Sequence, residues 1–323
     1  MILKQHGKEL EVLKLEALNR RFPIHHPMKG RVEKDLRIKR TEVRGEKEVD
    51  YPLSFLNRED FFILHNLRLL DENGFFQIDT LLLNEKFFLI LEVKNWYGTI
   101  LFDKEGQVIR IGDDGIEEGF NNPITQAKLQ VYRLRKWFRL LGIENLNLHY
   151  LVVIPFPSTI IKSLSPDCPV PEQVIHNQQL FFNINALEKL HESTHIRKDQ
   201  MITLSKKLID AHTPPTANLL EKYKMNKEQL IKGVVCTVCR TPGMIRKHKK
   251  WFCSKCNESS SSAHMESLND YKLLIDDHIS NQDIREFLQI NSPHVAKRLM
   301  LNGNFAQIGS KKGRLYKLEL SEG

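Results

Sequence analysis

Two apolar runs separated by a short polar turn constrain the fold of this chain most strongly. Leu81–Leu83 and Phe87–Leu91 flank the dipeptide Asn84-Glu85. Short apolar runs bounded by turn residues are typical of buried strands. The stretches 74–83 and 86–95 therefore predict two strands joined as a β-hairpin.

The hairpin also predicts which charged residues share a face. With Asn84-Glu85 as a two-residue turn, Asp79 faces Ile90 across the strands. Side chains alternate along a strand and cross-strand partners share a face, so we expect Asp79, Glu92 and Lys94 on one face. This prediction requires a loop with an even number of residues. The simpler alternative is that the three are unrelated charges at strand ends.

Such an arrangement suits phosphodiester chemistry. Asp79 and Glu92 would be diagonal neighbours about 7–8 Å apart at the backbone, close enough to share one cation. Two carboxylates can hold Mg²⁺ while the ion keeps several waters, and a nearby lysine such as Lys94 can orient a water and offset phosphoryl charge. Leu89, Leu91 and Val93 are expected in the core on the opposite face.

The surrounding pattern indicates an α/β layer. A helix is expected over 45–56, strands over 60–70 and 148–156, and an amphipathic helix over 122–142. The helix over 122–142 begins near Pro123 and ends at Gly142, which fits the usual preference for proline at helix starts and glycine at helix ends. Its apolar residues are expected to face the core: Ile124, Leu129, Tyr132, Leu134, Trp137, Phe138 and Leu141.

Several motifs in this region together resemble one known family. They are Gly45-Glu46, "QIDTLLL" with Asp79, "LILEVKNWYGTI" with Glu92 and Lys94, and "NPITQA" with Gln126. In this order, over about 44–155, the region resembles the nuclease-related domain, NERD, a branch of the PD-(D/E)-x-K nuclease superfamily. The resemblance implies a restriction-endonuclease-like core, with a mixed sheet flanked by helices.

The resemblance also implies roles for individual residues. Glu46, Asp79 and Glu92 would hold Mg²⁺ or Mn²⁺, Lys94 would be the catalytic lysine, and Gln126 would assist at the site or contact the substrate. Two alternatives stay open at this stage. Glu46 would otherwise be an acid at a helix N-terminus, complementing the helix dipole. Gln126 would otherwise be a polar residue on a helix surface.

Four cysteines predict a structural metal centre. Cys236, Cys239, Cys253 and Cys256 form two CxxC pairs separated by thirteen residues. Four thiolates satisfy a tetrahedral Zn²⁺, and the segment resembles a zinc ribbon that metal binding would largely fold. Beside it, basic residues and one aromatic residue are expected to grip phosphates and stack on an unpaired base: Arg246, Lys247, Lys249, Lys250 and Trp251.

The C-terminal segment resembles a winged helix-turn-helix. Ser280 with Asp283 predicts a capped first helix, and Ser292-Pro293 opens a second. Glycines 303, 309 and 313 surround a basic turn that would form the wing. A small helical protein-interaction domain is the alternative. The residues expected to contact nucleic acid are Ser292, His294, Lys297 and Arg298 on the recognition helix and Lys311, Lys312 and Arg314 in the wing.

Composition agrees with a polyanion partner. The net charge is +8, and residues 222–257 hold ten Lys or Arg against one acid. No apolar run reaches the length of a membrane span, and the charged N-terminus lacks signal-peptide features, so we expect a cytoplasmic protein without membrane contact. The expected segments are an N-terminal helical extension (1–40), the nuclease-like domain (41–212), a linker or helix (213–232), the ribbon (233–257) and the winged-helix-like domain (265–323).

These observations favour a metal-dependent nuclease or nucleic acid processing protein, acting on DNA. A DNA-binding or regulatory protein with an unused nuclease fold is one alternative, and an RNA-directed enzyme is another. DNA and RNA are not distinguished by the sequence.

Overall fold

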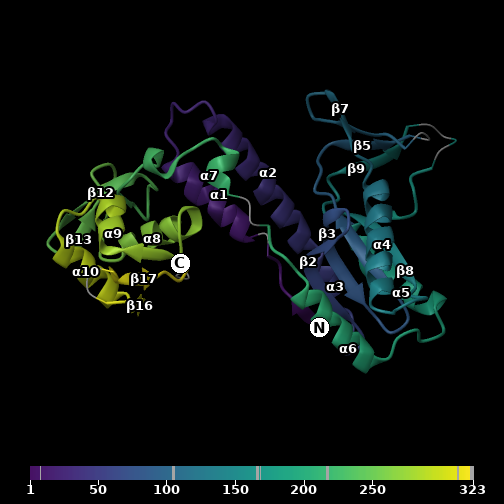
Figure 1. The fold of residues 1–323 in the computed structure, drawn as a ribbon. Coiled ribbons are helices and arrows are strands. Elements are labelled where there is room, and N and C mark those ends of the chain that lie inside the picture. The colour runs from purple at the N-terminus through teal and green to yellow at the C-terminus, as the bar shows by residue number, and fades with distance from the viewer. Residues whose placement is uncertain are drawn as a thin grey trace. The chain divides into compact units, whose positions relative to one another are not determined.

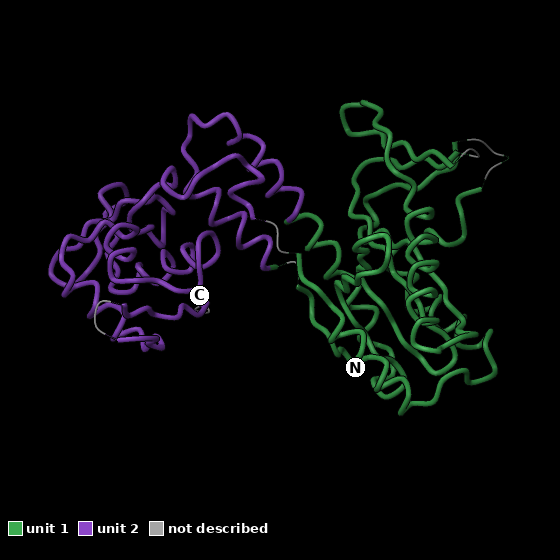
Figure 2. Tube along the Cα trace, viewed as in Figure 1, with its two compact units in different colours: residues 1–9, 40–215 green, residues 10–39, 216–323 purple. Residues whose placement is uncertain are grey.

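The computed structural model describes residues 1–7, 9–103, 106–164, 167, 169–215, 218–310 and 313–320. The chain forms two compact units, and neither is continuous in sequence (Figure 2). The first comprises residues 1–9 and 40–215, and the second comprises residues 10–39 and 216–323. In the part of the chain described, no helix combines the length and apolarity needed to cross a membrane.

A mixed sheet forms the centre of the first unit. Among the described residues it has six strands in the order β1-β2-β3-β4-β8-β10. The pairs β2–β3 and β3–β4 are antiparallel, and the other neighbours are parallel. The strands are β1 (Ile2–Lys4), β2 (Phe62–Asp71), β3 (Gly74–Leu83), β4 (Phe88–Val93), β8 (Leu148–Ile154) and β10 (Val174–His176).

Helices pack on this sheet in two separate apolar clusters. One cluster joins Leu134 and Phe138 of α4 to Ile90 of β4, and it also takes in α6. The other joins Leu53 of α3 and Ile184 of α5 to the strands. Figure 1 shows α4 running beside the sheet. The helices of this unit are the end of α2 (Lys29–Glu48), α3 (Asp50–Leu53), α4 (Pro123–Leu140), the 3-10 helix η1 (Asn177–Gln179), α5 (Leu180–Leu190) and α6 (Lys198–Asp210).

The predicted apolar face of α4 is only partly correct. Ile124, Leu134 and Phe138 are buried, but Leu129 and Tyr132 are 55% and 63% exposed. The buried stripe instead includes Ala127 and Gln130. The predicted helix ends are confirmed, because the Asn122 side chain caps the N-terminus and Gly142 adopts a φ of 72° after the last turn.

A second, smaller sheet lies beyond the end of β4. Its strand order is β7-β6-β5-β9. Ile100 and Val108 pack with Val152 and Ile154, which anchors this sheet on β8. The sequence analysis assigned no strands here. They are β5 (Thr99–Phe102), β6 (Val108–Ile111), β7 (Glu117–Phe120) and β9 (Ile160–Ser163).

The hairpin is present, but its predicted register is wrong by two residues. Leu83 pairs with Phe88, so the turn is Asn84–Phe87 rather than a two-residue turn. Asn84 stabilises it, accepting from Lys86 N through its side chain and donating its own N–H to Phe87 O. The pairing continues to Thr80 opposite Leu91, which places Asp79 opposite Glu92 instead of Ile90. Because the loop length stays even, the predicted sharing of one face survives.

The second unit combines N-terminal and C-terminal segments. Its strands form two sheets, β11-β12-β13-β14 and β15-β17-β16. The helices are α1 (Glu9–Arg21), the start of α2, α7 (Leu219–Lys222), η2 (Lys227–Gln229), α8 (Ala263–Leu274), α9 (Asn281–Leu288) and α10 (Pro293–Asn302). The strands are β11 (Val234–Val235), β12 (Pro242–Lys247), β13 (Lys250–Phe252), β14 (Ser259–Ser260), β15 (His278–Ser280), β16 (Ala306–Ile308) and β17 (Leu315–Lys317).

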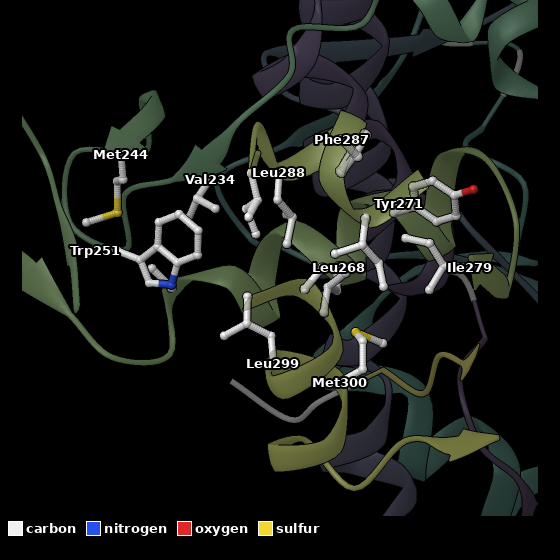
Figure 3. Packing of buried hydrophobic residues seen from close by; sticks show 14 of the residues in the cluster. Val234, Met244, Trp251, Leu268, Tyr271, Ile279, Phe287, Leu288, Leu299 and Met300 are labelled. Atoms are coloured by element: carbon white, nitrogen blue, oxygen red, sulfur yellow. The ribbon is translucent and has the colours of Figure 1, made fainter. Parts of the chain in front are cut away.

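One apolar core joins the cysteine segment to the C-terminal helices. Val234, Met244 and Trp251 belong to the same buried cluster as Phe287 and Leu299 (Figure 3). The serine-rich stretch between these segments supplies β14, which pairs with β13. The capping predictions are confirmed: the Ser280 side chain accepts from Asp283 N, and the Ser292 side chain accepts from Val295 N.

A buried ion pair ties α1 to this unit. The Arg21 guanidinium and the Asp270 carboxylate are both fully buried and lie 2.8 Å apart. Arg21 also donates to the carbonyl oxygens of Ile231 and Gly233. Arg20 also pairs with Asp270, at 2.6 Å, so removing Asp270 would leave the buried charge of Arg21 uncompensated, which is strongly destabilising.

Candidate active site and cysteine centre

Asp79 and Glu92 meet where β3 and β4 leave the regular ladder. Both side chains are buried. The Asp79 carboxylate accepts a hydrogen bond from the backbone N–H of Val93 at 3.1 Å, which fixes it beside the end of β4. Glu92 points to the same face, as the even hairpin loop requires.

Lys94 connects Glu92 to helix α4. Its Nζ lies 2.6 Å from Glu92 Oε1 and donates to Gln126 Oε1 at 2.9 Å. Gln126 is in the first turn of α4, which the Asn122 cap and Pro123 hold at that position. The structure therefore brings together Glu92, Lys94 and Gln126, three residues predicted from two separate motifs.

Gln130 is a member of this site that the sequence analysis missed. Its side chain is buried, and Nε2 donates to Glu92 Oε2 at 2.7 Å and to Gln77 O at 2.9 Å. The available signal was its position: Gln130 is one turn after Gln126, within the apolar stripe formed by Ala127 and Leu134. A polar residue on a buried stripe needs a polar partner.

Glu46 is buried near the C-terminal end of α2. The alternative reading of this residue as a helix N-terminal acid is therefore wrong. A carboxylate near a helix C-terminus is disfavoured by the helix dipole, so its position calls for compensation. Asn66 of β2 provides part of it, donating from Nδ2 to Glu46 Oε2 at 2.6 Å. Asn66 has a φ of 49°, and the sequence analysis did not predict its role.

Comparison with known proteins agrees with this geometry. Residues 41–155 match the family model described as the nuclease-related domain, NERD.

These residues form a NERD domain.

The matched range contains all the candidate residues of this site: Glu46, Asp79, Glu92, Lys94, Gln126 and Gln130. Searches among curated proteins and among solved structures found no match to the chain.

The electrostatics of the NERD site favour a bound cation. Burial, and next the negative charge of Asp79, raise the pKa of Glu92 to about 7. Two buried carboxylates that repel each other are stabilised by a divalent ion, and Mg²⁺ or Mn²⁺ accepts such oxygen ligands. The donor set therefore fits the metal that the family implies.

The three predicted carboxylates do not form a closed ligand group. Where the structure describes the chain, three groups of His, Cys, Asp or Glu have ligand atoms within 4.8 Å of one another, and the set Glu46, Asp79 and Glu92 is not among them. Asp79 and Glu92 come from the neighbouring strands β3 and β4.

The four cysteines do form a closed group. Cys236 Sγ lies 3.6 Å from Cys256 Sγ, and Cys239 Sγ lies 3.5 Å from Cys253 Sγ. Four sulfurs about 2.3 Å from one tetrahedral zinc stand about 3.8 Å apart, so the spacing suits Zn²⁺.

The two turns that carry these cysteines repeat one backbone design. Arg240 and Asn257, each four residues after the first cysteine of its pair, have φ values of 59° and 60° and donate their N–H groups back to Cys236 and Cys253. The segment between them is a tight hairpin, β12–β13, whose turn residues His248 and Lys249 have φ values of 47° and 70°.

The predicted nucleic acid contacts fall into two groups. Lys247, Lys249 and Lys250 on the β12–β13 hairpin are exposed, and Arg246 is half-buried. His294, Lys297 and Arg298 are exposed on α10, and Arg314 is half-buried. Lys311 and Lys312 lie outside the described residues.

The predicted stacking role of Trp251 does not fit the structure. The ring is 1% exposed, and its Nε1 donates to His264 Nδ1 at 3.3 Å. The Arg246 guanidinium covers the ring, with 5.0 Å between Cζ and the ring centroid. Trp251 is therefore part of the core that holds the hairpin, and its face is not free to receive a base.

Proposed function

We propose that the chain is a metal-dependent nuclease that hydrolyses phosphodiester bonds in DNA. The observation that carries this proposal is the Glu92–Lys94 contact inside the NERD domain, with Asp79 beside it. A buried carboxylate, a second carboxylate and a partly exposed lysine meet at the end of one hairpin. Metal-dependent phosphodiester hydrolysis can use carboxylates to hold the ion and a lysine to offset phosphoryl charge.

Asp79 and Glu92 would hold Mg²⁺ or Mn²⁺, with Glu46 as a further acid at the site. When bound, the ion lowers the pKa of a water ligand and polarises a phosphate oxygen. Gln130 keeps Glu92 in place through its 2.7 Å hydrogen bond, and Val93 N–H keeps Asp79 in place. The two carboxylates are therefore oriented by fixed donors before any substrate arrives.

Lys94 supplies a positive charge near the scissile phosphate. Its side chain is 22% exposed, so its ammonium can reach both Glu92 and a bound phosphate. There it would orient the attacking water and offset the charge that develops on the phosphoryl oxygens. Gln126 holds Lys94 from the other side and so limits the positions that the ammonium takes.

The second unit would deliver DNA to this site. We assign a zinc ribbon to residues 233–257 and a winged helix-turn-helix to residues 265–323, supported by the four-cysteine group and by the order α8, β15, α9, α10, β16, β17. Burial, and next the positive charge of Arg298 on α10, lower the pKa of Arg246 in the hairpin. The hairpin and α10 would together present basic side chains to phosphates.

Cleavage assays test the nuclease proposal. Single-stranded, duplex and branched DNA and RNA are incubated with the full chain and Mg²⁺ or Mn²⁺. The expected result is metal-dependent cleavage of DNA that Asp79→Ala abolishes. If no substrate is cut while DNA still binds wild type and Asp79→Ala equally, the chain is a DNA-binding protein. Cleavage confined to RNA would overturn the assignment of DNA.

Salt dependence tests the basic surface separately. The logarithm of the DNA-binding constant falls linearly with the logarithm of the salt concentration, by about 0.9 for each phosphate contact. The triple change Lys247→Ala, Lys249→Ala and Lys250→Ala should therefore make this slope shallower by about 2.7. The matched control removes three exposed lysines of α6: Lys198, Lys206 and Lys207. Equal slopes for both triple variants would remove the hairpin from the interface.

A further inference from the structure

A second group of metal-ligating side chains lies in the first unit, built from residues other than the acids of the NERD site. It consists of His6, Asp50 and His65, whose ligand atoms all lie within 4.8 Å of one another. His6 follows strand β1, Asp50 opens helix α3 and His65 belongs to β2. Three segments that are distant in sequence therefore converge on one point.

The spacing of these atoms suits a small transition-metal ion. Asp50 Oδ1 lies 3.1 Å from His6 Nε2 and 3.5 Å from His65 Nε2. Nitrogen and oxygen ligands about 2.0–2.1 Å from a tetrahedral zinc stand about 3.3 Å apart. The two imidazole rings stack, with 3.8 Å between their centroids and 20° between their planes, and the Nε2 atoms of both lie near the Asp50 carboxylate.

The His65 side chain is prepared as a ligand. It is fully buried, and its Nδ1 lies 3.0 Å from Thr80 Oγ1, also buried. In the tautomer that carries its proton on Nδ1, His65 donates to Thr80 and has its lone pair on Nε2. That Nε2 has no hydrogen-bond partner among the described residues, although it faces the Asp50 carboxylate. A buried lone pair facing a carboxylate is unfavourable unless a cation lies between them.

His6 is held in place from both sides. Lys4 Nζ donates to His65 O at 2.7 Å, and Gly7 N donates to Asn66 Oδ1 at 3.0 Å. These bonds fasten the chain before and after His6 to strand β2. The Lys4 ammonium adds a positive charge near His65.

We propose that His6, Asp50 and His65 bind a zinc ion, with water in the remaining coordination position. Two imidazoles and one carboxylate select zinc or a similar first-row transition ion over Mg²⁺, which prefers oxygen ligands alone. The Thr80 hydroxyl sets the tautomer of His65, as groups outside the ligand set commonly do. The ion would tie the segment that follows β1, and helix α3, to strand β2.

Zinc counting on the full chain tests this site. The protein is stripped with a chelator, reloaded with Zn²⁺ alone, desalted and analysed for metal. Wild type is expected to retain about two zinc ions per chain, one at the four cysteines and one here. His6→Gln with Asp50→Asn should retain about one. Cys236→Ser with Cys253→Ser should also retain about one, and His25→Gln, a control at an exposed loop histidine, about two.

A conservative variant keeps the test independent of folding. Thr80→Val preserves the side-chain volume, removes the partner of His65 Nδ1, and should weaken zinc binding at this site by about 10–100-fold. Thermal melting without zinc checks that each variant folds. About one zinc in wild type, or an unchanged count in His6→Gln with Asp50→Asn, would overturn the proposal. Since zinc is counted directly, the result does not depend on nuclease activity.

Discussion

Gly45 and Asn95 are so close that a Cβ atom added to Gly45 would stand 2.5 Å from Asn95 Cβ. Asn95 also donates from Nδ2 to the carbonyl oxygen of Thr41, in the same helix as Gly45, at 2.6 Å. Glu46 follows Gly45, and Lys94 precedes Asn95. This contact therefore holds the end of helix α2, which carries Glu46, against the end of strand β4, which Lys94 follows.

Gly45→Ala should damage both the fold and the site. The new methyl group displaces Asn95, so we expect a loss of about 1–3 kcal/mol in the free energy of unfolding and slower cleavage. Urea unfolding followed by circular dichroism measures the first effect. Gly30→Ala is the control in the same helix, where the added Cβ meets nothing within 4 Å. It should be neutral or stabilising by up to about 1 kcal/mol.

Gln130→Ala should slow cleavage without weakening DNA binding. The change removes the hydrogen bond that orients Glu92, and a hydrogen bond to a charged group contributes about 1.5–3 kcal/mol, or roughly 10–100-fold in rate. Steady-state kinetics should show a lower kcat at nearly constant KM. Leu129→Ala, at an exposed position of the same helix, is the control. Similar kcat values for the two variants would show that Gln130 does not orient the site.

The free energy of unfolding should fall at acid pH because His264 is buried in its neutral form. Burial, and next the charge of Arg246, lower the pKa of His264 to about 4, below the ordinary value of 6.5. Between these values the unfolded chain binds a proton that the folded chain does not, so stability present above pH 6.5 is lost as the pH falls toward 4. The full effect is about 3 kcal/mol.

His264→Gln isolates this contribution, because glutamine can still accept from Trp251 and cannot be protonated there. Urea unfolding of both proteins at several pH values gives the difference, in which any acid release of zinc largely cancels. Parallel curves between pH 7 and pH 4 would contradict the assignment.

Loss of the cysteine centre should loosen the C-terminal helices as well. Cys236 and Cys253 belong to the same apolar cluster as Ile284, Phe287 and Leu288 of α9. In Cys236→Ser with Cys253→Ser, hydrogen exchange of the α9 amides should therefore accelerate, while amides of α4 in the NERD domain keep their protection. Unchanged protection of α9 would mean that it folds independently of the cysteine segment.

The sequence predicted those elements whose signals are local. Strands β2, β3, β4 and β8 are apolar runs bounded by turn residues, and α4 carries its own caps. Strand β1 has three residues and pairs in parallel with a strand some sixty residues away, so no local signal reveals it. Strand β7, with the sequence EEGF, is too polar and too exposed to show a strand pattern.

The residues of the site likewise divide into those that the sequence predicted and those that it missed. The even hairpin loop brought Asp79 and Glu92 to one face even though the predicted register was wrong, because a shift of two residues preserves the alternation of side chains. Asn66 and Gln130 were missed because their partners, Glu46 and Glu92, come from distant segments. Polar side chains that serve a buried carboxylate become evident only when the fold brings the carboxylate to them.

The central claim is that Asp79, Glu92 and Lys94 form a nuclease active site, and the cleavage rate of Lys94→Ala tests it most directly. The matched control is Lys128→Ala, an exposed lysine on α4 near Gln126 in sequence. Both variants should bind DNA as wild type does. With Mg²⁺ at saturating DNA, Lys94→Ala should lose at least about 100-fold in cleavage rate, since removing one stabilising group from a charged transition state costs about that much. Lys128→Ala should cut at the wild-type rate. Cleavage by Lys94→Ala at the wild-type rate would contradict the assignment of the active site.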